Sequence, residues 1–188
     1  MIALTPIQIA SLVTAAIGGI HDVVTCTIPN WLTFGGAGVA IVMHLVNGGV
    51  YAAGWAVAGW LCAVGLSLAV KLLPVAFKLY TLENLPIGFG DTKLLGAVGA
   101  FLGPAMVPLV FFYFALFYGS FSFIQVARLM PWRKLALTLT LPKGVSKVDV
   151  EKVRAAGQTK IPIGPAIALG TITAVVFEKP TLTFLGFG

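Results

Sequence analysis

Long apolar runs, separated by short polar or glycine-rich breaks, dominate the hydropathy pattern of the chain. A run of about 18 apolar residues or more is typical of a membrane-spanning helix, so we interpret the runs as spans. The pattern predicts six of them. They are Ala3–Ile20, a second from Trp31 to Val46, Tyr51–Leu73, a fourth that begins just after Asp91, a fifth that runs through Phe111–Phe123 to about Arg128, and Ile161–Phe177.

Two breaks define the middle spans. The turn Asn47-Gly48-Gly49 ends the second, and Gly103-Pro104 divides the fourth from the fifth, because proline is favoured in the first turn of a helix and resisted inside one. The fourth helix, Thr92–Leu102, would then be about 16 Å long against a hydrocarbon core of about 30 Å. Either Asp91 is recessed below the membrane surface, or the helix continues past Pro104 with a kink.

Small residues recur one helical turn apart within the spans, a pattern that lets helix backbones approach closely. We expect these pairs to indicate a compact bundle and nothing more specific. The pairs are Gly54 with Ala58, Gly99 with Gly103 and Ala166 with Gly170.

The composition supports a membrane protein. Of 188 residues, 59% are hydrophobic and only 10% are charged, and the mean hydropathy is +1.00. A soluble protein of this size needs far more polar surface, so the bilayer is the solvent that fits. We predict an all-α polytopic membrane bundle of six transmembrane helices, with residues 1–188 forming a single integral membrane domain and 129–160 a basic loop within it.

The basic residues predict the orientation of the spans. Eight of the twelve Lys and Arg lie between Arg128 and Lys160, in a segment that lacks the aromatic interleaving of a nucleic-acid site. Six spans place eleven basic residues on the side of 21–30, 74–91 and 129–160, and only Lys179 on the other side. The positive-inside rule therefore predicts that these loops are cytoplasmic, with both termini outside. We expect the 129–160 loop to lie against the anionic inner leaflet and to bind no nucleic acid.

The first apolar run is expected to be a genuine span, because no Lys or Arg precedes it as in a signal peptide. Two further residue types receive no chemical role. Cys26 and Cys62 have no spacing that could build a zinc site, and we expect neither a disulfide framework nor a metal. His44, inside the second span, is expected to be a packed or hydrogen-bonded histidine.

Two acidic residues stand apart as candidates for chemistry. Asp22 follows the first span and Asp91 opens the fourth, so the predicted topology places both at the cytoplasmic face, where an ionisable group near hydrocarbon marks a functional site. Each also has a structural interpretation: Asp91 as a helix N-cap, Asp22 as a polar end to its span. The other four acids are assigned to loops or the tail. They are Glu83, Asp149, Glu151 and Glu178.

Together the two aspartates suit peptide hydrolysis. Like charges a few ångströms apart cannot both ionise cheaply, so two carboxyls can share one proton and one water. The ionised member would act as general base and the protonated one as general acid, without metal, thiol or cofactor. Gly88 and Gly90, on either side of Phe89, would give a backbone able to bend and lie close to an extended substrate.

The segment Gly88-Phe89-Gly90-Asp91-Thr92-Lys93 resembles the G-x-G-D-x-K motif of the type IV prepilin peptidases, the bacterial GxGD-type aspartyl proteases. The region from Asp22 through Ile28-Pro29-Asn30 to Trp31 is similar to the first motif of that family. Ile161-Pro162-Ile163-Gly164-Pro165-Ala166-Ile167-Ala168 looks like its final-span signature. The three motifs occur in the family's order and cover nearly the whole chain.

The resemblance implies that Asp22 and Asp91 are the catalytic pair, with no cofactor. It implies that a prepilin or pseudopilin precursor is cut at the cytoplasmic face of the bacterial inner membrane, just before its hydrophobic helix. The motif residues expected to lie along the substrate's approach are Gly88, Gly90, Lys93, Pro29 and Asn30.

The chain departs from the family pattern in two places. Val23–Thr27 contains no basic residue, where many members carry one or two. The N-terminal region with paired cysteines, linked to N-methylation in long members, is also lacking. We therefore expect the short, peptidase-only form associated with Flp/Tad pili, without methyltransferase activity. A further hypothesis is that Glu83, Asp149 and Glu151 attract the basic leader peptide of the substrate. Reversing the charge of these three residues would test it.

Two other classes stay open at this stage. A small transporter or channel subunit could use Asp22 and Asp91 to bind cations or relay protons. Against it, the chain has no obvious inverted repeat and its carboxyls are predicted at one face rather than at the midplane. A purely structural subunit of a secretion system would need neither aspartate.

Overall fold

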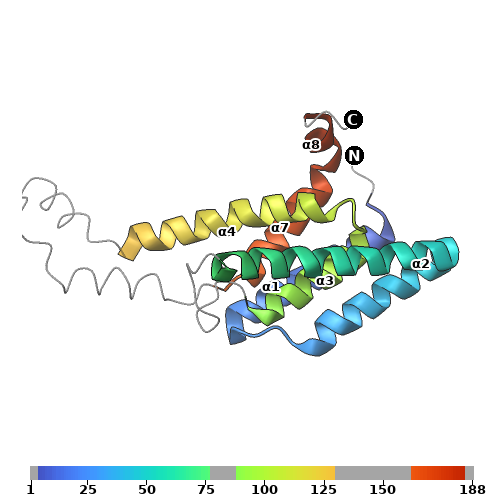
Figure 1. Ribbon diagram of the computed structural model, residues 1–188, viewed down its shortest axis with the longest axis horizontal. Helices are drawn as coiled ribbons and strands as arrows, with labels where there is room; N and C mark the ends of the chain where they lie inside the picture. The colour runs from blue at the N-terminus through green and yellow to red at the C-terminus, as the bar shows by residue number, and fades with distance from the viewer. Residues whose placement is uncertain (1–3, 77–87, 130–161, 185–188) are drawn as a thin grey trace, which may run out of the picture. The chain divides into compact units, whose positions relative to one another are not determined.

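The computed structural model describes residues 4–76, 88–129 and 162–184, and all regular structure in these ranges is helical. The prediction of an all-α bundle is therefore confirmed. The six helices, labelled in Figure 1, are α1 (Pro6–Thr25), α2 (Asn30–Ala76), α3 (Phe89–Leu102), α4 (Val107–Leu129), α7 (Gly164–Val176) and α8 (Glu178–Phe184).

Several sequence predictions lie outside the described residues. They concern Glu83, Asp149, Glu151, Ile161 and the basic loop from residue 130 to 160. The chain forms two compact units, Met1–Phe117 with Pro162–Gly188, and Tyr118–Ile161. The described part of the second unit is the last portion of α4. The candidate chemistry lies in the first unit, and the single-domain organisation stays a prediction.

Helix α1 starts three residues after the start of the first predicted span, Ala3–Ile20, and runs five residues beyond its end. It starts at Pro6 after the N-cap Thr5, whose side chain and that of Gln8 form a reciprocal capping box. It ends at Thr25, because Cys26 adopts the left-handed conformation with φ of 52°. The predicted end of the span at Ile20 is therefore too early as a helix boundary, and Asp22 lies inside the helix. The reason is that polarity marks the edge of the membrane, while a backbone cap ends the helix.

The second and third predicted spans correspond to the two parts of α2. Gly49 interrupts the helix with a φ of 70° and a ψ of −164°, a conformation that favours glycine. Figure 1 shows that the chain changes direction within α2. The predicted turn at Asn47-Gly48-Gly49 is confirmed.

The predicted break between the fourth and fifth spans is also confirmed. Helix α3 ends at Leu102, capped by Gly103 with φ of 78°, and α4 starts at Val107. The alternative of one kinked helix through Pro104 is wrong, because the glycine cap stops α3 first. With 14 residues, α3 is about 21 Å long, shorter than a hydrocarbon core of about 30 Å.

The last predicted span, Ile161–Phe177, corresponds to α7, which has 13 residues and starts at Gly164 with Pro165 in its first turn. Helix α8, which follows directly, was not predicted. Its segment contains Glu178, Lys179 and Pro180, which lack the apolar pattern on which the span prediction relied.

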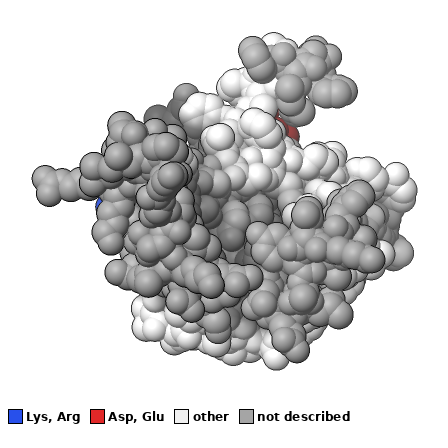
Figure 2. Space-filling model, turned by 60° about the vertical axis from the view of Figure 1, so that its left-hand side comes forward, with Lys and Arg blue, Asp and Glu red and all other residues white. Residues whose placement is uncertain are grey.

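The helices have the length and surface of an integral membrane protein. Three stretches are long and apolar enough to cross a bilayer, Pro6–Thr25, Asn30–Leu72 and Val107–Gln125, and α7 is a shorter apolar helix. Because Gly49 divides the second stretch, it supplies two of the predicted spans. The described residues on the face shown in Figure 2 are almost all uncharged. Large apolar side chains such as Val50, Tyr51 and Phe123 are more than 70% exposed, as expected of lipid-facing residues.

The core is built from small residues. Ala37 and Ala40 of α2 pack with Ala97, Ala100 and Phe101 of α3 in one buried cluster. At the end of α3, the ring Nε2 of His44 lies 2.9 Å from the Phe101 carbonyl oxygen. This carbonyl belongs to the last turn of α3, where helix carbonyls lack an intrahelical partner. The interpretation of His44 as a hydrogen-bonded structural residue is confirmed.

Candidate active site

The ends of four helices meet around Asp22 and Asp91. These are the last turn of α1 and the first turns of α2, α3 and α7. A Cβ on Gly90 of α3 would lie 3.4 Å from the Cβ of Ile28, which precedes α2. The Gly164 N–H, at the start of α7, lies 2.8 Å from Asp22 Oδ2. The helix ends that the six-span topology places on one side therefore converge in the structure.

Asp22 is buried in the last turn of α1, with 6% of its surface exposed. Its Oδ2 accepts the Gly164 N–H, at the positive end of the α7 dipole. The fit is close: a Cβ on Gly164 would lie 2.7 Å from the Asp22 Cβ and 3.0 Å from the Gly19 Cα. Glycine at 164 therefore lets α7 approach α1 closely enough to hold this carboxylate.

Asp91 is equally buried, with 7% of its surface exposed, in the first turn of α3. Its Oδ2 accepts the Gly88 N–H at 2.9 Å. Gly88 is the N-cap and Asp91 is the third residue of the helix, so the N-cap interpretation of Asp91 is wrong by position, although its carboxyl does satisfy an N-terminal N–H. A Cβ on Gly88 would lie 2.9 Å from Asp91 Oδ2. Glycine here leaves room for the carboxyl group.

The two carboxyls interact electrostatically. Burial raises the pKa of the Asp91 carboxyl from 3.8 to about 6; the Gly88 N–H lowers it, the Asp22 carboxylate raises it, and the Lys71 ammonium lowers it. Asp91 precedes the predicted membrane segment Thr92–Leu102. A carboxyl of this kind keeps its proton at mildly acidic pH, whereas an ordinary aspartate does not.

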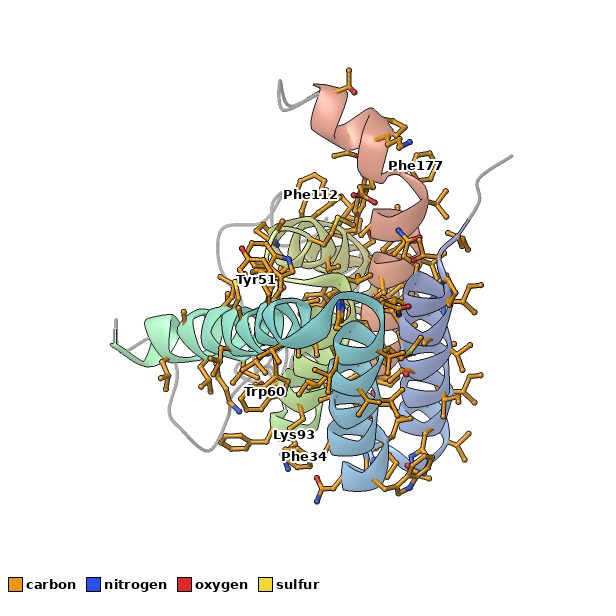
Figure 3. The ribbon with its side chains drawn as sticks, turned by 90° about the vertical axis from the view of Figure 1, so that its right-hand side faces the viewer. Phe34, Tyr51, Trp60, Lys93, Phe112 and Phe177 are labelled. Atoms are coloured by element: carbon orange, nitrogen blue, oxygen red, sulfur yellow. The ribbon has the colours of Figure 1, made fainter. Side chains whose placement is uncertain are left out.

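The motif residues of α2 and α3 contact one another directly. Lys93 Nζ donates a hydrogen bond to the Asn30 side-chain oxygen at 2.9 Å and lies 5.3 Å from the centre of the Phe34 ring. Figure 3 shows Lys93 beside Phe34 at one end of the bundle, with Phe112 and Phe177 toward the other. The Pro29 carbonyl accepts the Thr33 N–H in the first turn of α2. The structure thus brings Pro29, Asn30 and Lys93 to the same end as both aspartates.

A hydrogen-bonded turn links α1 to α2 beside Asp22. His21 Nδ1 lies 2.7 Å from the Thr27 carbonyl oxygen and 2.8 Å from Thr25 Oγ1. Thr25 Oγ1 also donates to the His21 carbonyl. These bonds close the chain around the left-handed Cys26 and fix the direction in which the Ile28-Pro29-Asn30 segment leaves α1.

Sequence reasoning missed two contributors to this site. Gly164 appeared only as a letter in a motif, because its bond to Asp22 spans 142 positions. Lys71 was counted only for topology, although it is 2% exposed and its ammonium lies 3.3 Å from the centre of the Phe89 ring. The sequence did contain an indication of this role, because Lys71 is the one charged residue in the predicted span Tyr51–Leu73. An ionisable residue inside a span indicates a functional site.

The arrangement can carry out acid–base chemistry on a bound water. Each carboxyl accepts one backbone N–H through Oδ2, and a carboxyl has about four lone-pair sites, so capacity for a water remains. In the described residues, no group of three His, Cys, Asp or Glu side chains is placed to hold a metal ion.

Comparison with known proteins identifies the family. No curated protein and no solved structure gives a significant match to the chain. The model of the type IV leader peptidase family matches residues 9–123, which include both aspartates and more than half of the chain. The chain therefore belongs to the type IV leader peptidase family, as a membrane-embedded protease of the prepilin peptidase type.

Proposed function

We propose that this peptidase is of the aspartyl type and that Asp22 and Asp91 are its catalytic pair. The observation that carries the proposal is the burial of both carboxyls at one end of the bundle, where that burial, together with the Asp22 carboxylate, raises the pKa of Asp91. Two interacting carboxyls that share one proton are the arrangement with which an aspartyl protease activates water.

The chemistry follows from the two environments. Asp22, held by the Gly164 N–H at a helix N-terminus, is the ionised member, and it takes a proton from water as the water oxygen attacks the scissile carbonyl carbon. Asp91, with its pKa raised to about 6, donates its proton to the carbonyl oxygen. When the tetrahedral intermediate collapses, the C–N bond breaks, Asp22 returns its proton to the leaving amine, and Asp91 takes back the proton of the oxygen.

The proposed substrate is a prepilin or pseudopilin precursor, cut on the cytoplasmic side of the membrane. The family supplies the substrate class, and the side follows from the eleven-to-one bias of basic residues. Within this proposal, Gly88, Gly90 and the linked residues Pro29, Asn30 and Lys93 border the path of the substrate to the aspartates. Precursors of the Flp type are the first to assay.

Purified protein in detergent, given several pilin-like precursors, tests the proposal. We expect Asp22→Asn and Asp91→Asn each to reduce the cleavage rate by about 10²–10⁴-fold or more, since each removes one half of the acid–base pair. Asparagine keeps the size of the side chain, and the melting temperature of each variant checks that it folds. Cleavage that survives either substitution contradicts the dyad. No cleavage of any precursor by the parent protein favours the transporter alternative instead.

A further inference from the structure

Lys71, near the end of α2, is a buried cation. Only 2% of its surface is exposed, and it is the one charged residue between Tyr51 and Leu73. Removing an ammonium group from water costs several kcal/mol in effective terms unless nearby groups compensate. A buried lysine therefore needs nearby groups that interact favourably with its ammonium, and the identity of these groups indicates what the lysine does.

Its described partners both belong to the first turn of α3. The ammonium nitrogen lies 3.3 Å from the centre of the Phe89 ring, a cation–π geometry whose attraction strengthens when the cation is desolvated. Phe89 is 68% exposed while Lys71 is buried, so the ring lies between the ammonium and the surroundings. The same ammonium acts on the Asp91 carboxyl, whose pKa it lowers.

We propose that Lys71 is a positioning residue of the dyad, holding the first turn of α3 through Phe89 and balancing the negative charge of Asp91. The inference rests on the proposed aspartyl function. Two carboxyls without a nearby cation would retain their shared proton too strongly, and Asp91 would release it only at higher pH. Lys71 therefore lowers the pH above which the dyad loses its acid.

Among the described residues, the charged groups that act on Asp91 come from two neighbouring helices. Asp22 acts on it from α1 and Lys71 from α2, while α7, over Gly164–Val176, contains no titratable side chain. On α3 itself, Lys93 is bonded to Asn30. Because Asp22 is part of the dyad, Lys71 is, in the part of the chain that the structure describes, the group whose removal changes the field at Asp91 without removing a reacting carboxyl.

The pH profile of kcat/KM tests this role in Lys71→Met, Lys71→Arg and the control Lys179→Met, an exposed lysine of α8. Losing the cation raises the pKa of Asp91, so the alkaline limb of Lys71→Met is expected to move up by roughly 0.5–1 pH unit, with a lower kcat. Lys71→Arg keeps the charge and the cation–π contact, so the alkaline limb of its kcat/KM profile should lie closer to that of the parent than the limb of Lys71→Met does. Lys179→Met keeps the parental profile.

A second measurement does not depend on cleavage. Because the folded protein binds the Asp91 proton more tightly than the unfolded chain, the parent loses stability relative to Asp91→Asn as pH rises from about 4 to about 6. In the Lys71→Met protein this loss of stability should extend to higher pH. It is measured as the difference in melting temperature between Lys71→Met and the double variant that also carries Asp91→Asn. An unshifted alkaline limb or an unshifted stability window in Lys71→Met overturns the proposal, however far the rate falls. Cleavage by Asp91→Asn would overturn the aspartyl function instead.

Discussion

Asp22 occupies a position that helix electrostatics disfavours. It lies in the last turn of α1, where its carbonyl accepts the Cys26 N–H, and a negative charge near a helix C-terminus is unfavourable. The N-terminus of α7 reverses this, since the Gly164 N–H donates to the Asp22 carboxylate. The position is therefore built by two helices, one of which supplies the acid and the other its stabilisation.

Substitution of Gly164 should separate the Asp22 carboxyl of α1 from the N–H of α7 that stabilises it. A Cβ there would lie 2.7 Å from the Asp22 Cβ and 3.1 Å from its Oδ2, so Gly164→Ala must displace either the carboxyl or α7. We expect cleavage to fall at least about tenfold, and stability to fall by about 1–3 kcal/mol, as in other overpacked sites. The cleavage rate and melting temperature of the purified variant measure both effects.

Gly38→Ala is the matched control, because a Cβ at Gly38 of α2 meets no atom within 4 Å. It should cleave at the parental rate, with stability unchanged or raised by about 0.4–1 kcal/mol. Equal behaviour of the two variants would contradict the close approach of α7 to Asp22.

At the scale of the elements, glycines set the distance between α2 and α3. A Cβ on Gly99 would lie 2.5 Å from the Gly59 carbonyl oxygen and 2.7 Å from the Ala63 Cβ, and a Cβ on Gly59 would overlap the Gly99 carbonyl oxygen. The predicted small-residue pair Gly99 and Gly103 thus lies in a close helix contact. Its partner in α2 is Gly59, whereas a Cβ on Gly54, from the separate pair Gly54 and Ala58, meets no atom within 4 Å.

This contact supports the helix that carries Asp91, so widening it should affect both stability and activity. We expect Gly99→Ala to destabilise the protein by about 1–3 kcal/mol, because the overlap is with backbone rather than with a flexible side chain. Cleavage should fall as the start of α3 shifts. Thermal unfolding in detergent and a cleavage assay measure the two effects.

Gly65→Ala serves as the reference for this prediction, since Gly65 is exposed on α2 with no atom within 4 Å of a Cβ. Its melting temperature should equal or exceed that of the parent. If Gly99→Ala melts at the same temperature as Gly65→Ala, α2 and α3 do not pack as closely as described.

At the scale of the whole molecule, the two free cysteines report the orientation in the membrane. Cys26 is exposed at the C-cap of α1, beside the candidate site, and Cys62 is exposed within the apolar Asn30–Leu72 stretch. If the site faces the cytoplasm, a membrane-impermeant maleimide should label Cys62→Ser protein in inside-out vesicles and leave it unlabelled in right-side-out vesicles. Labelling measured by mass shift distinguishes the two.

Cys26→Ser protein provides the control, because the remaining Cys62 thiol faces lipid, where a polar reagent and the reactive thiolate are both disfavoured. It should be labelled in neither preparation. Labelling of Cys26 from the outer side would reverse the proposed orientation, and with it the side on which precursors are cut.

The amino-acid sequence by itself determined the membrane class, the helix breaks and the two candidate acids. These properties depend on local features: apolar runs, a glycine able to adopt positive φ at 49 and 103, and carboxyls beside hydrocarbon. The tertiary structure alone decided which groups surround those acids. The Gly164 N–H on Asp22 and the Lys71 ammonium over Phe89 join distant segments, and the raised pKa of Asp91 comes first from burial. Burial and long-range pairing are properties of packed helices, and no local pattern of residues encodes them.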